Sequence, residues 1–286
     1  MLRTLAWLML CSLATISVAA ERAQVRIVSL APSLTELAFA AGAGDRIVAT
    51  VEYSDYPQAA RAIPRIGDAF RVDLERVLEL RPDFVLAWES GTPAATIERL
   101  RALGLNVEIV STQTLAEVSA ALRHLGELAG TRSAADAAAK RFESQIARLR
   151  EEYRDRKPVS VFVQINDRPL YTVNGNHIIS EIAALCGGTN VFAALRDLAP
   201  TIGIEAVIAA NPDAIVSTDS SVTDAMAHWR RWETLTAVRA RNVFTLPSDE
   251  LARATPRLVT GARSMCRALE TARENLRRTA SGLSRP

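Results

Sequence analysis

The chain has 286 residues, of which 49% are hydrophobic, 23% are charged and 5% are aromatic, and its formal net charge is +2. This composition excludes an intrinsically disordered, collagen-like or coiled-coil protein. Basic and acidic residues are interspersed and form no single basic stripe, so the sequence offers no electrostatic footprint for nucleic acid. The length predicts one large domain or two smaller domains.

Residues 1–20 have the pattern of a secretory signal peptide. Arg3 supplies a positive charge, Leu5–Val18 is an uncharged apolar run, and Val18-Ala19-Ala20 offers small residues for cleavage. We therefore predict a mature chain that begins near Glu21. The apolar run is too short for a membrane-spanning helix, and no longer uncharged run follows, so the sequence predicts a soluble exported protein.

Cysteine usage fits export. Cys11 lies within the predicted signal, behind large residues that do not suit a lipoprotein cleavage site, and cleavage leaves Cys186 and Cys266. In an exported protein these two form either one disulfide or two buried free thiols. A disulfide would stabilise the fold by about 4 kcal/mol on the chain-entropy model. No histidine lies close to either cysteine in the sequence, which argues against a thiol nucleophile.

From residue 24 onward, short apolar runs alternate with segments of helical periodicity. The alternation predicts an α/β lobe with a parallel sheet. Strands are expected at Gln24–Leu30, Val48–Val51, Phe84–Trp88 and Val107–Val110. Helices are expected at Pro32–Ala41, Asp73–Leu80, Ala94–Leu103 and Leu115–Ala129.

Residues 133–156 contain neither glycine nor proline, and their apolar residues recur at helical spacing. They predict one continuous helix about 36 Å long, which Pro158 ends. A second α/β set follows. Its strands are expected at Val159–Gln164, Ala214–Ser217 and Val243–Leu246, and its helices at Ile178–Leu185, Ile204–Ala210, Val222–Trp229 and Pro256–Leu276.

The two sets share an internal repeat. Residues 74–86 align without gaps on residues 204–216, and each segment reads as a helix, a Pro-Asp turn and an apolar strand. The alignment places Glu75 and Glu205 at equivalent positions in the first turn of each helix. An acid there complements the helix dipole, worth about 0.3 to 1 kcal/mol, or serves a role that both lobes share.

Several kinds of chemistry lack the residues they require. The histidines, His124, His177 and His228, are widely separated, and neither H-E-x-x-H nor paired cysteine spacing occurs, so no metal site is predicted. The phosphate-binding loop, the G-x-S-x-G elbow and the G-x-G-x-x-G fingerprint are also absent. Acidic residues are abundant, so an exported hydrolase that uses two carboxylates stays open as an alternative.

Aromatic and charged residues follow the predicted strands. In open α/β sheets, ligands bind beyond the carboxyl ends of the strands. Aromatic faces there suit a flat, partly apolar ligand, with Asp and Arg at its polar rim, although Phe70 and Trp88 would equally suit packing between lobes. The candidate ligand-binding residues are Tyr53, Phe70, Trp88, Tyr171, Asp249, Glu250, Leu251, Ala252 and Arg253.

Segments spread over the mature chain resemble the periplasmic cobalamin-binding proteins of bacterial ABC importers. These belong to a wider group that also binds ferric siderophores and haem. The Tyr-Ser-Asp-Tyr-Pro, Cys-Gly-Gly and Asp249–Arg253 segments point to cobalamin, whereas the others are shared by the wider group. The resembling segments are Arg26–Ser33, Thr35–Gly42, Tyr53–Pro57, Leu74–Arg76, Pro82-Asp83, Ala87-Trp88, Cys186–Gly188, Asn190–Phe192 and Ser248–Arg257.

The resemblance implies a class III periplasmic binding protein. Two three-layer α/β lobes, 21–130 and 158–286, would be joined by a single long rigid helix, 131–157, which limits hinge opening. The ligand would lie between the lobes, in contact with Tyr53 and the Asp249–Arg253 loop, with Trp88 and Tyr171 as aromatic surface. Cys186 would bridge Cys266. Such a protein is a periplasmic monomer without a cofactor or catalytic activity.

The resemblance also gives the repeated acids a role. In such importers one acid on each lobe meets arginines on the two permease halves, so Glu75 and Glu205 are expected to dock the transporter.

The sequence departs from the cobalamin-binding pattern at two places that concern the ligand. Glu250 and Leu251 stand where the cobalamin pattern has aromatic residues, and Pro200-Thr201 where it has a tryptophan. Cobinamide, haem or a ferric siderophore therefore stays an alternative ligand.

Overall fold

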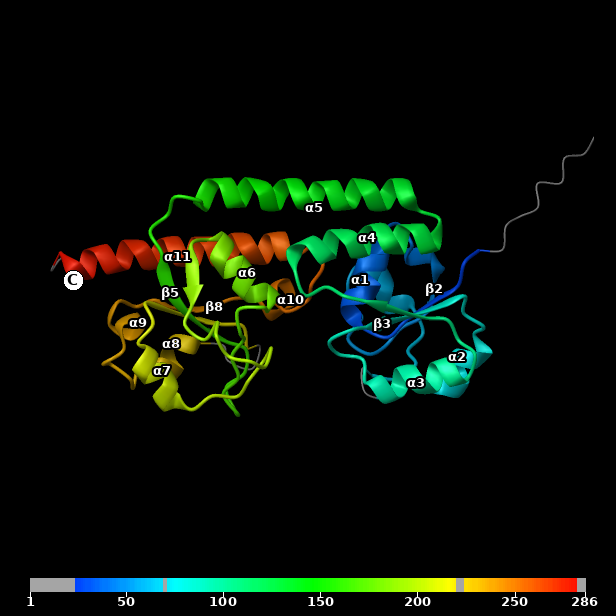
Figure 1. The fold of residues 1–286 in the computed structure, drawn as a ribbon, viewed down its shortest axis with the longest axis horizontal. Coiled ribbons are helices and arrows are strands. Elements are labelled where there is room, and N and C mark those ends of the chain that lie inside the picture. The colour runs from blue at the N-terminus through cyan, green and yellow to red at the C-terminus, as the bar shows by residue number, and fades with distance from the viewer. Residues whose placement is uncertain (1–23, 69–70, 220–223, 282–286) are drawn as a thin grey trace, which may run out of the picture.

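The computed structural model describes residues 24–68, 71–219 and 224–281. Two α/β lobes lie side by side, each with a four-stranded parallel sheet (Figure 1). The strand orders are β2-β1-β3-β4 and β6-β5-β7-β8. The lobes therefore have the predicted class and the same topology. The predicted signal peptide and Phe70 lie outside the described residues.

The N-terminal lobe follows the predicted alternation of strands and helices. Its central strands are almost wholly buried because helices cover both faces of the sheet, which explains their continuous apolar character. The strands are β1 (Ile27–Ser29), β2 (Ile47–Ala49), β3 (Phe84–Trp88) and β4 (Val107–Val110). The helices are α1 (Pro32–Ala40), α2 (Leu74–Glu79), α3 (Ala94–Ala102) and α4 (Leu115–Ala129), with 3₁₀ turns at Gly44–Arg46 and Gln58–Ala62.

The C-terminal lobe contains the predicted elements and three short ones that the sequence pattern does not reveal, namely β6, α9 and α10. Asp224 caps α8 by accepting a hydrogen bond from the Ala227 N–H at 3.1 Å, and the predicted start at Val222 lies outside the described residues. The strands are β5 (Val159–Gln164), β6 (Gly188–Asn190), β7 (Ala214–Ser217) and β8 (Val243–Thr245). The helices are α6 (Ile178–Leu185), α7 (Ile204–Ala210), α8 (Ala225–Trp229), α9 (Thr236–Arg239), α10 (Ser248–Leu251) and α11 (Leu258–Ala280).

The predicted long helix is α5 (Arg132–Tyr153), which runs along one side of both lobes (Figure 1). It packs against α4 of one lobe and α11 of the other. A Cβ at Gly126 of α4 would lie 2.2 Å from Cβ of Ala135, so this glycine allows α4 and α5 to approach closely. One apolar core runs from the N-terminal lobe through α5 into the C-terminal lobe. The predicted domain boundaries stay predictions.

Both long helices, α5 and α11, bury one apolar stripe and expose charged residues. Such a stripe faces the core of a globular protein. Within the ranges that the structure describes, no helix is long and apolar enough to cross a membrane. Of the two long helices, α5 contacts elements of both lobes.

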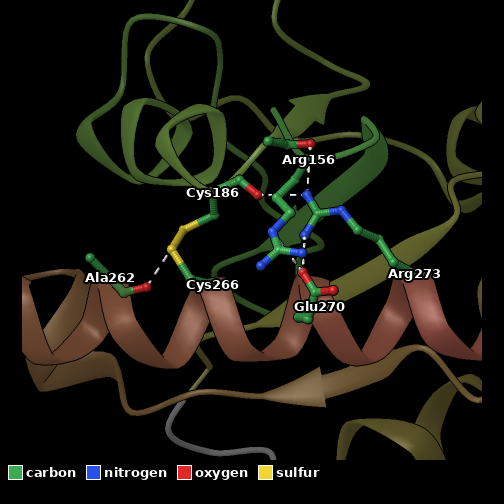
Figure 2. The surroundings of a disulfide bond; sticks show 7 residues. Arg156, Cys186, Ala262, Cys266, Glu270 and Arg273 are labelled. Atoms are coloured by element: carbon green, nitrogen blue, oxygen red, sulfur yellow. Dashed lines mark hydrogen bonds and ion pairs between the residues drawn. A yellow bond between two sulfur atoms is a disulfide. The ribbon is translucent and has the colours of Figure 1, made fainter. Parts of the chain in front are cut away.

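A disulfide between Cys186 and Cys266 confirms the predicted bridge and ties the end of α6 to α11 (Figure 2). Both cysteines are fully buried. Beside them, Arg273 of α11 donates hydrogen bonds to the carbonyl oxygens of Cys186 at 2.6 Å and Lys157 at 2.7 Å. Burial lowers the pKa of Arg273, against the opposing effect of Glu270. The disulfide and this buried arginine together hold α11 on the second lobe.

Candidate functional site

A pocket of about 420 Å³ lies between the lobes. The carboxyl ends of β1 and β3 form its N-terminal side, and the residues after α10 form its C-terminal side. The pocket thus lies beyond the carboxyl ends of strands of the N-terminal sheet, where ligands bind in open α/β sheets. Its lining residues are Leu30, Ala31, Pro32, Ser33, Trp88, Ser90, Gly91, Thr92, Ala252 and Arg253.

Trp88 is the aromatic residue of this pocket. It ends β3, and its backbone N–H donates a hydrogen bond to Oγ1 of Thr92 at 2.9 Å. A Cβ at Gly91 would lie 2.1 Å from the Trp88 ring. Any residue other than glycine at position 91 would therefore displace the indole. Trp88 thus lies in the pocket wall.

The loop after β2 presents two exposed tyrosines. Tyr53 is 77% exposed and has a positive φ of 64°, a conformation that costs energy for a residue with a side chain. Tyr56 is 46% exposed. Ser54 between them is buried and hydrogen-bonded to Thr50 at 2.8 Å, and Arg65 donates to its carbonyl oxygen at 2.8 Å. The loop backbone is therefore anchored while both rings face outward.

The segment at α10 divides into residues that line the site and residues that do not. Ala252 and Arg253 line the pocket, and Asp249 is exposed and pairs with Arg253 at 3.3 Å. Leu251 is fully buried in the core, and its ligand contact stays a prediction. Glu250 is half-buried, and its carbonyl oxygen lies 2.3 Å from the place of a Cβ on Gly261. Close packing of α10 on α11 thus turns part of this segment inward.

An ion-pair network that the sequence analysis missed joins the lobes beside the pocket. Glu36 of α1 accepts hydrogen bonds from Arg253 at 3.0 Å and from Arg257 at 2.5 and 2.9 Å. Thr255 Oγ1 donates to the same carboxylate at 3.1 Å, and Arg253 also donates to Asp55 at 2.7 Å. The Arg257 guanidinium lies 4.2 Å from the ring centre of Tyr56. Segments far apart in the chain thus form one polar cluster.

The network shifts the pKa values of Asp55, Arg253 and Arg257. The hydrogen bond from Arg253 lowers the pKa of Asp55, against the opposing effect of burial. Burial by itself would lower the pKa of Arg253, but the hydrogen bonds to Asp55 and Glu36 outweigh it and raise that pKa. Hydrogen bonding to Glu36 raises the pKa of Arg257 in the same way. The lowered pKa of Asp55 makes this carboxyl group a poor general acid or base at neutral pH.

Tyr171 occupies a different part of the second lobe. Isolated backbone bridges join it to Asn166 and Thr201, and its side chain is partly buried. Among the described residues that line the pocket, neither Tyr171 nor Tyr53 is found. Tyr53 extends from a loop of the first lobe, and Tyr171 follows β5 of the second, so the two rings come from opposite lobes.

The repeated acids lie on equivalent surfaces. Glu75 and Glu205 are exposed in the first turns of α2 and α7, and residues 71–77 and 201–207 have the same alternation of burial. The two helices lie on the side of the molecule away from α5 (Figure 1). Within the described parts of the chain, neither carboxylate forms an ion pair. Both carboxylates are therefore accessible at the surface of the molecule.

Metal ligands do not gather anywhere in the described ranges, since no group of three or more His, Cys, Asp or Glu residues could hold an ion. His177 caps α6, where its Nδ1 accepts a hydrogen bond from the Ile179 N–H at 3.1 Å. Burial lowers the pKa of His177 to about 4. His228 lies 3.1 Å from Asp167. These histidines thus have partners within the fold.

Comparison with known proteins covers most of the chain. Residues 27–250 match the family model described as periplasmic binding protein. A vitamin B12-binding protein of Vibrio cholerae is 34% identical over 250 residues, which cover 87% of this chain and 90% of that protein. A vitamin B12-binding protein of Yersinia pestis is 34% identical over 86% of both chains.

Solved structures share the fold. The crystal structure of the periplasmic vitamin B12 binding protein BtuF of Vibrio cholerae matches with a TM-score of 0.81 and 35% identity, over 87% of this chain and 98% of that one. The periplasmic heme-binding protein RhuT of Roseiflexus sp. RS-1 matches with a TM-score of 0.76 and 25% identity, over 87% and 99%. The architecture is thus common to proteins named for different ligands.

Proposed function

Because the chain belongs to the periplasmic binding protein family, we propose that it captures cobalamin or a related corrinoid between its lobes and delivers it to an ABC importer. One observation carries this proposal: the pocket between the lobes brings Trp88 of one lobe beside Arg253 of the other. An aromatic wall and a cationic rim suit a large ring system with polar substituents. The identity to vitamin B12-binding proteins over 87% of the chain supports this ligand class.

The ligand-contacting surface would include the exposed Tyr53, Trp88 in the pocket wall, and the segment at Asp249 and Ala252–Arg253. Tyr171 of the second lobe is a further proposed contact, and Phe70 is proposed from the sequence alone. Tyr53 supports this role because a 77% exposed tyrosine, held with a positive φ, has no packing function in the fold. Glu250 contributes backbone to the same segment, and Leu251 holds that segment on the core.

The protein would act without chemical turnover, as a monomer in the periplasm. A carboxylate-based hydrolase needs a carboxyl group with a raised pKa in the cleft. The carboxylates beside this pocket are instead paired with arginines, and the pKa of Asp55 is lowered. The described features therefore support binding and release over hydrolysis.

Docking to the importer would use Glu75 and Glu205. A protein with two matched lobes that sits on a two-fold permease needs the same charge on both lobes. The shared exposure of the two acids, and their freedom from ion pairs within the described ranges, support this role. Each carboxylate would meet arginines on one permease half.

Calorimetric titration tests the ligand. The purified mature chain is titrated with cyanocobalamin and, in parallel, with cobinamide, haemin and a ferric hydroxamate. Saturable one-to-one binding of a corrinoid is the expected result. Tight binding of haemin or the hydroxamate without corrinoid binding would replace the ligand and keep the binding class. No binding of any of the four would overturn the proposed function.

A further inference from the structure

The carboxylate of Glu36 is the centre of the contact between the lobes. Glu36 is 3% exposed, although it lies on α1 among apolar residues. It receives Arg253, Thr255 and both Nε and Nη2 of Arg257, all from the segment after α10. Burying a carboxylate is costly unless its oxygens are hydrogen-bonded, and here four donors satisfy both oxygens. The segment 253–257 is thus held against α1 at a defined position.

The same two arginines also reach the loop after β2. Arg253 donates to Asp55 at 2.7 Å, and Arg257 lies over the Tyr56 ring at 4.2 Å from its centre. A guanidinium stacked on a tyrosine face is attracted by the ring electrons and restricts the ring. Tyr56 keeps 46% of its surface exposed beyond that contact. Arg257 therefore packs on one face of the Tyr56 ring and leaves the rest of the ring accessible to a ligand.

The loop is held from two directions. From its own lobe, Ser54 is fixed by Thr50 and by Arg65. From the other lobe, Asp55 and Tyr56 are fixed by the arginines that Glu36 orients. An apolar contact between the lobes would cost less desolvation free energy. Paired charges with several directed hydrogen bonds instead define the relative position of the two segments. The network is suited to setting the position of the loop relative to the second lobe.

We propose that Glu36 and Arg257 are positioning residues of the ligand site, and that Tyr56 is a further ligand-contacting residue that Arg257 holds in place. Glu36 fixes Arg257, Arg257 supports the Tyr56 ring, and Arg253 ties Asp55 to the segment that lines the pocket. The two ligand-contacting segments, one on each lobe, are thereby set at a fixed separation. The proposal rests on the proposed function for its ligand, but the tie between the lobes is measurable without ligand.

The test compares Arg257→Ala and Arg257→Lys with the wild type. Arg257→Lys keeps the charge but loses the bidentate hydrogen bonds and the planar stacking. Arg263→Ala is the matched control, because Arg263 lies in α11, whose N-cap is Arg257, and is exposed. Within the part of the chain that the structure describes, its side chain bonds only Gln145, at 3.0 Å. Thermal unfolding first establishes that each variant folds.

Two measurements follow. Titration with cyanocobalamin is expected to show affinity lowered about tenfold or more by Arg257→Ala, less by Arg257→Lys, and unchanged by the control. Hydrogen–deuterium exchange without ligand is expected to rise in residues 53–57 for Arg257→Ala, less for Arg257→Lys, and not for the control. Glu36→Gln, a variant of nearly the same shape, should reproduce both effects, and Glu143→Gln, which removes an exposed ion pair, should reproduce neither.

A double-mutant cycle separates positioning from general stability. If Arg257 acts through the ring, Arg257→Ala will change cyanocobalamin affinity much less in a Tyr56→Ala background than in the wild type. Equal effects in the two backgrounds would overturn the role of Tyr56. Exchange that rises while affinity stays at the wild-type value would overturn the positioning role. If the wild type binds no corrinoid, the proposed function fails. If hydrogen–deuterium exchange in residues 53–57 is unchanged in Arg257→Ala and Glu36→Gln, the proposed contact between the lobes is refuted, whatever the ligand.

Discussion

Arg253 and Asp55 come from opposite lobes, and Nη1 of Arg253 lies 2.7 Å from Oδ1 of Asp55. The contact connects the segment after α10 with the loop after β2, the two segments predicted to meet the ligand. The Asp55 side chain remains half-exposed, so the pair defines geometry more than it adds stability. Its charge state is therefore a convenient report on whether the lobes keep this contact.

The Asp55 carboxyl is expected to titrate below its ordinary pKa of 3.8. A lowered pKa in the folded state means that the contribution of the pair to stability is complete above 3.8 and is lost as the pH falls through the folded-state value. The pKa is measured by following the Asp55 carboxyl carbon by nuclear magnetic resonance. In Arg253→Ala the pKa should return toward 3.8. An unchanged titration in that variant would mean that the contact does not form in solution.

Tyr53→Ala is expected to weaken cyanocobalamin binding by about 1 to 3 kcal/mol, roughly 5- to 150-fold in Kd, through the loss of an aromatic contact. Stability should not change, because the ring is 77% exposed. Calorimetric titration and urea unfolding measure the two effects. Leu103→Ala is the matched control, since Leu103 is an exposed apolar residue at the C-terminal end of α3 and does not line the pocket. Equal affinities for the two variants would remove Tyr53 from the site.

The long periodic elements could be predicted because their apolar residues are numerous enough to define a period. Gly188–Asn190 could not be predicted as β6, because a three-residue edge strand of Gly, Thr and Asn has neither an apolar run nor β-branched alternation. α10 (Ser248–Leu251) lacks the length for a helical pattern and is set by packing on α11. Local pattern thus fixes the order of the large elements and leaves the short ones to tertiary contacts.

The candidate site was predictable in part, because the sequence pattern locates the ends of the main strands. The rule for open α/β sheets selects Trp88 and Arg253 as site candidates without knowledge of contacts, and both residues line the pocket. The role of Glu36 was not predictable, because its partner Arg257 lies 221 residues away in the chain. One signal was present: Glu36 is an acid within an apolar helix, where burial requires a partner. Sequence alone does not name that partner.

The buried disulfide leads to a prediction about stability. Replacing Cys186 and Cys266 together with alanine should lower the free energy of unfolding by about 4 kcal/mol on the chain-entropy model. Urea unfolding measures this change. Because both cysteines are fully buried, a reductant should not alter the native wild type and should act only once denaturant unfolds it. Rapid reduction of the native protein would show that α11 detaches readily from α6.

Gly91→Ala is expected to disturb the pocket without unfolding the lobe. The added Cβ would lie 2.1 Å from the Trp88 ring, so the indole must leave its position. Cyanocobalamin affinity should fall, and the tryptophan fluorescence of the ligand-free protein should change. Ser90→Ala is the control, since it alters the adjacent pocket residue and adds no atom. Wild-type affinity in Gly91→Ala would show that the position of Trp88 does not matter for binding.

Glu75→Ala combined with Glu205→Ala is expected to leave cyanocobalamin affinity unchanged, because both acids are exposed on α2 and α7, outside the pocket. The apparent affinity for the importer should fall by about tenfold or more, since two charge contacts are lost together. Uptake of labelled cyanocobalamin into proteoliposomes that contain the importer measures this change. Added salt should weaken docking of the wild type and affect the double variant less, because salt screens exposed charges.

The control for docking must remove the same net charge elsewhere. Glu143→Ala combined with Glu274→Ala does so on α5 and α11, which lie on the other side of the molecule (Figure 1). If uptake falls equally in both double variants, net charge rather than the two matched surfaces governs docking. If uptake falls only for the variant of Glu75 and Glu205, the two single variants show whether the lobes contribute equally.

Arg76 lies next to Glu75 and pairs with Glu79 at 2.7 Å, whereas α7 carries no basic residue. Because Glu79 already balances the charge of Arg76, α2 and α7 carry the same net charge, and the two single variants should lower uptake by similar amounts.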